Sequence, residues 1–409
     1  MNKLLFFILL SVAVVTTAAG QTDSSKRTPS LNSKSETKPK WFDKLALRGY
    51  LQVRYNRLLE TNPDLKCEQC DKSMGEDGGL FIRRARIYFF GQIHERVYIY
   101  IQPDFASAAS STGLNFGQIR DAYFDLGFDK KNEFRARVGQ SKIPYGFINM
   151  QSSQNRLPLD RDDGLNSAAS NERDMGVFLY WAPQKIRKRF ASLVADGLKG
   201  SGDYGVFAFG VYNGQTANKP ELNNEMYMVA RATYPFKIGK KQIIEPGIQA
   251  YTGKYTLAPD QLSKGVKSVA GNTYLDRRVA ATFVLYPQPF GIQAEYNVGK
   301  GPEFNNATDS IETRNISGGY AILSYMLKFK NQLIYPFVRG QYYAGGKKFE
   351  LDARSYTVNE FEAGVEWKPL PNFELVATYN IARRRFEDFV KQNNVQQGRL
   401  LRLQAQINF

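Results

Sequence analysis

The 409-residue sequence contains one histidine and two cysteines, and no long apolar segment follows its N-terminal stretch. A structural zinc site needs four ligands, and a Ser–His–Asp set needs a histidine beside its nucleophile. His94 is distant in sequence from Cys67 and Cys70. We therefore expect no metal, no cofactor and no catalytic residue. A membrane-spanning helix needs about 20 consecutive apolar residues, so the chain after its N-terminus offers no such helix.

The N-terminal residues have the features of a secretory signal. Lys3 supplies a positive charge, residues 4–15 form a short apolar stretch, and residues 18–20 are small, as at a cleavage site. An uncleaved anchor helix is the alternative, and the short apolar run disfavours it. We expect residues 1–20 to be a cleaved signal peptide. Residues 21–41 are polar and without periodicity, which indicates a disordered periplasmic spacer.

The chain is basic, with a net charge of +16. Such a charge can attract nucleic acid, anionic lipid or an anionic solute, and export across a membrane disfavours nucleic acid. Export also permits disulfides, so the closely spaced pair in "CEQC" predicts a local disulfide between Cys67 and Cys70.

Both ends of the chain after the spacer alternate strictly between apolar and polar residues. In "LLRLQAQINF", residues 400–409, apolar side chains at every second position face one way and Arg402, Gln404, Gln406 and Asn408 face the other. Residues 45–56 alternate in the same way. Such a strand either packs on a protein core or has lipid on one face and water on the other.

Strand length favours the membrane. Most candidate strands have ten to fourteen residues by our reading of the sequence, close to the ~9–11 that a tilted strand needs to cross a bilayer, whereas strands of soluble proteins peak at ~5–6. The sixteen candidates cover 45–57, 80–93, 95–106, 117–128, 133–143, 174–183, 204–214, 225–236, 242–255, 275–287, 289–299, 317–329, 332–345, 356–369, 372–385 and 398–409.

The connections alternate in length. Every second one is short and built from turn residues, and the others are longer and polar, which is typical of an outer-membrane barrel with short periplasmic turns and long external loops. We therefore predict an all-β fold, a sixteen-stranded antiparallel transmembrane β-barrel over residues 42–409. One connection, 184–203, is long although it lies on the side of the short turns. It is either a periplasmic excursion or a sign of a misplaced strand.

Five phrases carry a family resemblance. "FIRRARIYFFG" (81–91), "DAYFDLGF" (121–128), "VGQSKIPYGF" (138–147), "ERDMGVFLYW" (172–181) and "VYNG" (211–214) occur in an order that resembles the phosphate-selective porins of the O/P type. The terminal Phe409 resembles the signal read by barrel-assembly machinery. The resemblance implies a trimeric barrel with a basic lining and a constricting loop after the fifth strand, here residues 144–173.

The resemblance also assigns site residues. In the resembled family a lysine contacts the anion near the constriction, which carries over to Lys142. Serines on the inward loop donate there, so Ser152 and Ser153 are candidates, and Asp121 matches an acid that tunes the site. The loop itself is balanced in charge, with Arg156, Arg161 and Arg173 against Asp160, Asp162, Asp163 and Glu172.

The polar phase of the strands supplies further candidates. Basic and acidic residues on this phase are nearly equal over the whole barrel, but arginines gather on the first five strands. A ladder of guanidinium groups on one wall would bind an anion and pass it between equivalent sites. The ladder candidates are Arg48, Arg54, Arg84, Arg86, Arg135 and Arg137. The alternative is that these arginines pair with neighbouring acids and line a general pore.

Two arginines, Arg83 and Arg120, fall on the apolar phase of their strands. At the bilayer midplane an arginine would cost about 2–4 kcal/mol. We expect them near the outer leaflet, in contact with lipopolysaccharide phosphates or a neighbouring subunit. A register error is the alternative.

The sequence therefore predicts a passive porin of the bacterial outer membrane, with outer-membrane lipid and lipopolysaccharide as partners and a preference for anions such as phosphate or polyphosphate. The resemblance implies that this porin is a homotrimer. Alternatives are a general non-selective porin and a binding or attachment protein that acts through its external loops. A secreted all-β enzyme is a third class, for which Glu360 and Glu362 could form a carboxylate pair.

Overall fold

The computed structural model describes residues 40–59, 79–106, 117–239 and 241–409. Its helices and strands all lie in the compact unit Trp41–Phe409. The strands are β1 (Ala46–Leu59), β2 (Gly79–His94), β3 (Val97–Asp104), β4 (Gln118–Gly127), β5 (Phe134–Lys142), β6 (Arg173–Trp181), β7 (Phe207–Tyr212), β8 (Tyr227–Thr233), β9 (Phe236–Ile238), β10 (Gln242–Thr256), β11 (Thr273–Leu285), β12 (Phe290–Asn305), β13 (Ser310–Tyr325), β14 (Leu327–Phe329), β15 (Gln332–Gly346), β16 (Ser355–Leu370), β17 (Phe373–Glu387) and β18 (Val395–Asn408).

Helices are short and few in the described residues. They are α1 (Phe147–Met150), α2 (Asp163–Asn166) and α3 (Gln184–Ala195), with the 3-10 turns η1 (Trp41–Lys44), η2 (Ser170–Glu172), η3 (Pro259–Gln261), η4 (Ala270–Asn272) and η5 (Leu351–Ala353). Among the helices of the described ranges, none is both long and apolar enough to span a membrane.

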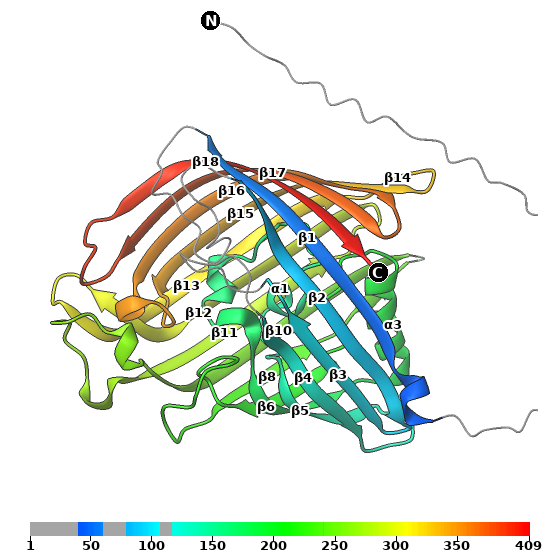
Figure 1. The fold of residues 1–409 in the computed structure, drawn as a ribbon, viewed down its shortest axis with the longest axis horizontal. Helices are drawn as coiled ribbons and strands as arrows, with labels where there is room; N and C mark the ends of the chain where they lie inside the picture. Colours follow the sequence, from blue (N-terminus) through cyan, green and yellow to red (C-terminus); the bar gives the residue numbers. More distant parts are fainter. Residues whose placement is uncertain (1–39, 60–78, 107–116, 240) are drawn as a thin grey trace, which may run out of the picture. The chain divides into compact units, whose positions relative to one another are not determined.

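The strands form one closed antiparallel sheet (Figure 1). β8 and β9 pair in turn with β10, and β13 and β14 pair in turn with β15, so each of these pairs is one interrupted strand. The eighteen segments therefore make sixteen strands. β1 pairs with both β2 and β18, which closes the ring. The predicted sixteen-stranded barrel is confirmed.

Closure extends to the last residue. The backbone N–H of Gly49 donates to the carbonyl oxygen of Phe409 at 2.8 Å, and Phe409 donates back to Gly49 at 3.0 Å. Hydrocarbon offers no hydrogen-bond partner, so a sheet that crosses a bilayer must pair every strand edge internally. The mutual bonds between Gly49 and Phe409 satisfy this requirement at the seam.

The alternating pattern gives the sheet an apolar outside and a polar inside. On β18, Leu403 and Ile407 are 42% and 43% exposed, whereas Gln404 and Gln406 are buried inside the ring. On β1, Arg54 is likewise buried while Leu47 is exposed. The apolar face of these strands is therefore the outer surface, which is the arrangement that a lipid environment requires.

Two β-bulges change the predicted orientation of Arg83 and Arg120. The register between β1 and β2 skips Arg83, and the register between β3 and β4 skips Arg120. A bulge inserts an unpaired residue and redirects its side chain. The expectation that both arginines contact lipopolysaccharide or a neighbouring subunit is therefore wrong, and the alternative, a register error, is confirmed. Arg83 lies 3.5 Å from Asp160, and Arg120 lies 3.5 Å from Glu172, both on the inward-folded loop.

Candidate functional site

The connection between β5 and β6 crosses the interior of the barrel. At its start, the backbone N–H groups of Phe147 and Ile148 donate to Glu295 on β12 at 2.6 and 2.8 Å. Further along, Asp160 binds Arg54 on β1 at 3.0 Å and also pairs with Arg402 on β18. The prediction that residues 144–173 enter the lumen is confirmed, and the contacts with β1, β12 and β18 hold the loop against opposite walls.

The end of this loop is tied to further strands. Asp163 pairs with Lys347, in the connection after β15, at 2.8 Å and with Arg384 on β17 at 3.1 Å. Burial alone would raise the pKa of Asp163, but Arg384 and Lys347 outweigh it and lower the pKa to about 2. Burial is outweighed in the same way at Glu172, whose pKa is held below its usual range by Arg161, Arg120 and Arg173. Both carboxylates therefore keep their charge at neutral pH.

The long connection between β6 and β7 also folds inward. Its helix α3 buries Ile186, Phe190 and Leu193, which recur at helical spacing, against a cluster that includes Phe147 and Tyr286. Beyond the helix, Lys199 pairs with Glu366 on β16, and the carbonyl oxygen of Lys199 accepts from Gln151 at 2.7 Å. This resolves the expectation for 184–203: it is an internal segment on the short-turn side, and the strands around it were placed correctly.

Two neighbouring cavities lie beside these inward segments. The first, about 400 Å³, is lined by residues of β1–β5, of the loop 143–172 and of the segment after α3. The second, about 340 Å³, reaches the short turns β2–β3 and β4–β5. Tyr98, Tyr123 and Arg137 line both cavities. These two cavities therefore lie along the wall built by the first five strands.

The structure brings seven of the ten predicted pore residues to these cavities. Arg48, Arg86, Asp121, Arg137, Lys142 and Ser152 line the first, and Arg135 with Arg137 lines the second. The others, Arg54, Arg84 and Ser153, do not line either cavity: Arg84 donates to Gln52 at 2.8 Å, and Ser153 shares a hydrogen bond of 2.7 Å with Tyr50. Cys67 and Cys70 lie outside the described residues.

Lys142 is held at the edge of the loop. Its ammonium group donates to the carbonyl oxygens of Met150 at 2.7 Å and Gln151 at 3.0 Å. Nearby, Asp121 Oδ2 accepts a hydrogen bond from Arg173 Nε at 2.9 Å and forms an ion pair with Arg173 Nη2, also at 2.9 Å. The ammonium group of Lys142 therefore lies beside an acid whose charge is already balanced.

Charge on the two cavities is strongly uneven. Three acids line them, and each is ion-paired: Asp121 with Arg173, Asp125 with Arg137, and Asp203 with Arg135 and Arg187. Eight basic residues line them, namely Arg48, Arg86, Arg96, Arg135, Arg137, Lys142, Arg173 and Arg187. Within the described ranges, Arg48, Arg96 and Lys142 have no carboxylate at ion-pair distance.

Elsewhere in the lumen, arginines and glutamates of the described strands form ion pairs. Arg339 binds Glu360 at 2.8 Å and Glu362 at 2.7 Å, and Glu360 also binds Arg384 at 2.8 Å. The two glutamates therefore act as counter-ions of arginines, which accounts for them without general acid–base chemistry. The near balance of charge over the whole barrel reflects these pairs.

Sequence reasoning missed the aromatic lining of the open path. Tyr88, Tyr100 and Tyr123 stack across neighbouring strands, with ring centroids 5.8 and 5.2 Å apart, and the guanidinium carbon of Arg137 lies 3.9 Å from the Tyr123 centroid. The signal was present, because Tyr98 and Tyr100 alternate with Val97 and Ile99 and so share the polar phase of β3.

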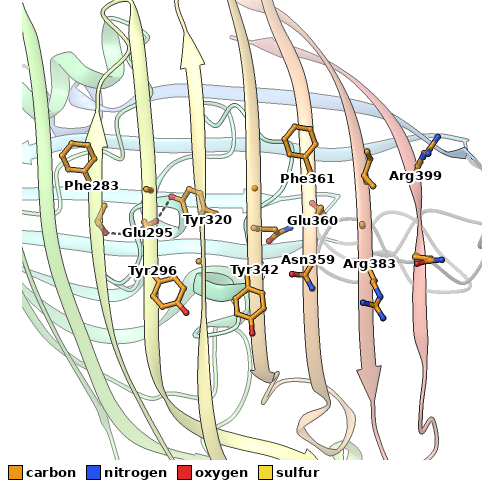
Figure 2. A pocket seen from close by; sticks show the side chains of 18 of the residues that line it. Phe283, Glu295, Tyr296, Tyr320, Tyr342, Asn359, Glu360, Phe361, Arg383 and Arg399 are labelled. Carbon is orange, nitrogen blue, oxygen red and sulfur yellow. Dashed lines mark hydrogen bonds between the residues drawn. The ribbon is translucent and has the colours of Figure 1, made fainter.

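A separate hollow of about 1400 Å³ lies on the outer face of β11–β18 (Figure 2). Exposed Phe283, Tyr296, Tyr342 and Phe361 surround it, and Arg383 lies at one side. It is therefore part of the surface that faces the surroundings of the barrel, and it is distinct from the internal path.

A closed barrel with an apolar exterior, an inward-folded loop and a basic internal path defines an outer-membrane channel. A family profile for phosphate-selective porin O and P matches residues 64–409, and the chain belongs to this family. A sequence search of curated proteins finds no match. Family and fold point to a channel rather than an enzyme.

Solved structures with a similar fold are outer-membrane proteins. The outer membrane channel DcaP of Acinetobacter baumannii has a TM-score of 0.55 at 13% identity, covering 89% of this chain and 97% of DcaP. OmpF of Salmonella typhi, in a complex with daunomycin, has a TM-score of 0.54 at 14% identity with the same coverage. OmpT of Vibrio cholerae reaches 0.51 at 10% identity, again over 89% and 97%. At these identities the likeness shows the fold alone.

Proposed function

We propose that this outer-membrane channel lets small hydrophilic solutes diffuse passively and prefers anions such as phosphate or polyphosphate. The observation that carries the proposal is the lining of the two cavities, where eight basic residues outnumber three acids. Five of the eight are ion-paired, one of them Arg86 with Asp104, and in the described chain Arg48, Arg96 and Lys142 have no carboxylate at ion-pair distance. A narrow passage with low-dielectric walls concentrates such a field and raises the local concentration of anions.

The proposed contacts follow the open wall. Lys142 and Ser152 supply donors beside the inward loop, Arg86 and Arg137 lie further along, and Arg48 carries a charge without a carboxylate partner in the described chain. Arginine binds phosphate oxygens with two parallel hydrogen bonds and stays protonated at any physiological pH. Several weak sites in series favour passage over retention.

The other predicted residues have supporting roles in this proposal. Arg54 and Arg84 hold the wall and the loop through Asp160 and Gln52, and Ser153 anchors the loop to Tyr50. Asp121 positions Arg173 at the cavity rather than binding the solute.

The test is the reversal potential of single channels in planar bilayers across a KCl gradient. We expect a potential of the sign that chloride-preferring channels give, and a shift towards zero in Lys142→Gln combined with Arg48→Gln. Lys219→Gln, an exposed residue outside both cavities, is the matched control. Cation preference in the wild type would reject the proposal, and absence of preference would leave a general porin. A folded protein without conductance would favour an attachment protein acting through its loops.

The proposal extends to the ends and partners of the chain. We propose that residues 1–20 are a cleaved signal, that 21–41 form a periplasmic spacer before the barrel domain 42–409, and that the channel is a homotrimer. Mass spectrometry of the mature N-terminus and chemical cross-linking in native membranes test the signal and the trimer.

Lipopolysaccharide stays the proposed lipid partner, but through other arginines than Arg83 and Arg120. Arg83 and Arg120 face inward, but Arg383 and Arg385 are exposed on the outer surface of β17, near its long-loop end. Guanidinium groups at this level can bind lipid phosphates. Loss of co-purifying lipopolysaccharide in Arg383→Gln with Arg385→Gln would support the assignment, and unchanged lipopolysaccharide content would remove it.

A further inference from the structure

The first cavity of the lumen is unusually aromatic for an aqueous channel. Six aromatic residues line it in addition to Tyr50: Tyr88, Phe90, Tyr98, Tyr100, Tyr123 and Tyr204. The interior of a water-filled barrel is ordinarily polar, and apolar surface exposed to water is unfavourable. Packing does not explain these rings, because Tyr88, Phe90, Tyr98, Tyr100 and Tyr123 are only partly buried and border open space.

The rings form a continuous row across the wall. Phe90, Tyr88 and Tyr100 lie within 6.3 Å of one another by ring centroids, and Tyr100 stacks on Tyr123 at 5.2 Å. A guanidinium group stands at each end: Arg48 lies 5.4 Å from the Phe90 ring, and Arg137 lies 3.9 Å from the Tyr123 ring. Stacking and cation–π contacts of this kind hold rings in fixed positions.

Polar groups of the same cavity suit a polyhydroxylated solute. Gln102, Ser152, Gln154, Asn155 and Ser201 supply amide and hydroxyl groups. Some already engage the row, since the Tyr100 hydroxyl donates to Gln102 at 3.0 Å. Binding sites for small organic ligands combine aromatic walls with a few polar groups that fix orientation. Inorganic phosphate has no surface that an aromatic row could contact.

We infer that this aromatic row, together with Arg48 and Lys142, selects anions carried on a sugar ring, such as sugar phosphates or uronic acids. This inference rests on the proposed anion preference and specifies the solute. The ring of the sugar contacts the aromatic row through its C–H groups, its hydroxyls bind the amide side chains, and its anionic group is attracted by the cations that lack a carboxylate partner. The contacts are weak and repeated, so they guide diffusion.

The experiment measures block of single-channel current in planar bilayers by four solutes. Glucose 6-phosphate has ring, hydroxyls and charge; inorganic phosphate lacks the ring, glucose lacks the charge, and benzoate lacks the hydroxyls. We expect glucose 6-phosphate to bind most tightly, and Tyr100→Ala with Tyr123→Ala to weaken its binding about three- to tenfold. Tyr100→Phe with Tyr123→Phe should keep most of the affinity, because the rings remain.

Controls separate this inference from folding and from anion preference. Tyr342→Ala removes an exposed ring on the outer face and should leave block unchanged, and the heat-modifiable shift of each variant reports folding. Equal or tighter block by phosphate, glucose or benzoate overturns the inference. If the channel prefers anions in a KCl gradient but does not favour glucose 6-phosphate, only this inference fails. If it prefers cations, the proposed function fails as well.

Discussion

Lys199, on the segment that follows helix α3, forms an ion pair with Glu366 on β16, and both side chains are almost fully buried. In the ring of sixteen strands, β16 stands opposite β6, from which this segment departs. The pair therefore lies across the lumen and holds this connection, which is on the short-turn side, against the far wall. Lys368 lies 3.5 Å from the same carboxylate.

We predict that Lys199→Met loosens this internal segment. Breaking a buried pair by removing one partner typically costs about 3–5 kcal/mol, and the nearby Lys368 should reduce the loss to about 3 kcal/mol or less. The temperature of barrel unfolding in detergent should fall, and single-channel conductance should rise and become noisier. Lys254→Met, which removes an exposed Lys–Glu pair, is the matched control and should cost under about 1 kcal/mol. Equal effects of the two variants would contradict the role given to Lys199.

Asp125→Asn should increase anion preference. Asp125 binds Arg137 through two hydrogen bonds, of 2.7 and 2.9 Å, at the place where the two cavities meet. The amide keeps the size of the side chain but removes the charge that offsets the guanidinium. The reversal potential in a KCl gradient should move further in the anion direction, whereas Asp260→Asn, in an external loop, should leave it unchanged. A shift towards cations would show that Arg137 does not face the permeation path.

Asp160→Ala should release the middle of the inward loop. Asp160 is the shared acceptor of Arg54, Arg83 and Arg402. Its removal leaves buried guanidinium groups without their carboxylate partner, and breaking a buried ion pair in this way typically costs about 3–5 kcal/mol. We expect larger conductance together with a lower unfolding temperature. Unchanged conductance in a destabilised but folded variant would mean that the loop does not limit flow.

Stability should fall in acid through Asp163. The pKa of Asp163 is lowered to about 2 because Arg384 and Lys347 outweigh the effect of burial. The unfolded value is about 3.9, so the ion pairs contribute their full stability above that pH and lose it as pH falls towards 2. As the pH falls towards 2, the wild type should lose about 2 kcal/mol of unfolding free energy through Asp163, and Asp163→Asn should not show this loss. The unfolding temperature of the variant should therefore fall less steeply with acid than that of the wild type. Parallel slopes for the two proteins would contradict the assignment.

The barrel could be predicted because its cause is repeated at every strand. Alternation places Leu403 outside and Gln404 inside, and the closed sheet converts that local pattern into a global one. The same logic failed at Arg83 and Arg120. One extra residue in a strand reverses which side chains face inward, and nothing in the residue types reveals the position of such a bulge. For that reason, strict alternation assigns both arginines to the apolar phase of their strands.

The lumen was harder to predict than its wall. Which arginines meet solute depends on where the inward loop and α3 come to rest, and those contacts, such as Lys199 with Glu366, join residues far apart in sequence. Arg54 and Arg86 look equivalent by phase, yet the loop covers Arg54 and leaves Arg86 at the cavity. The family resemblance pointed to Lys142 through a local motif, and Lys142 lines the first cavity, but its contact with a solute stays a prediction.

The seam between Gly49 and Phe409 constrains how the protein can be made. Strand β1 comes before all the other strands in the sequence, and the edge that it does not share with β2 pairs with β18, which follows all the others. Until these two strands pair, a long, alternating edge is open to misplaced pairing with another chain. Contacts between residues so far apart in sequence also form slowly, because the chain loses conformational entropy before the stabilising contacts form. We therefore expect folding to depend on protection of this edge until β18 pairs with it, and a tag fused after Phe409 to disturb the end of the β1–β18 seam.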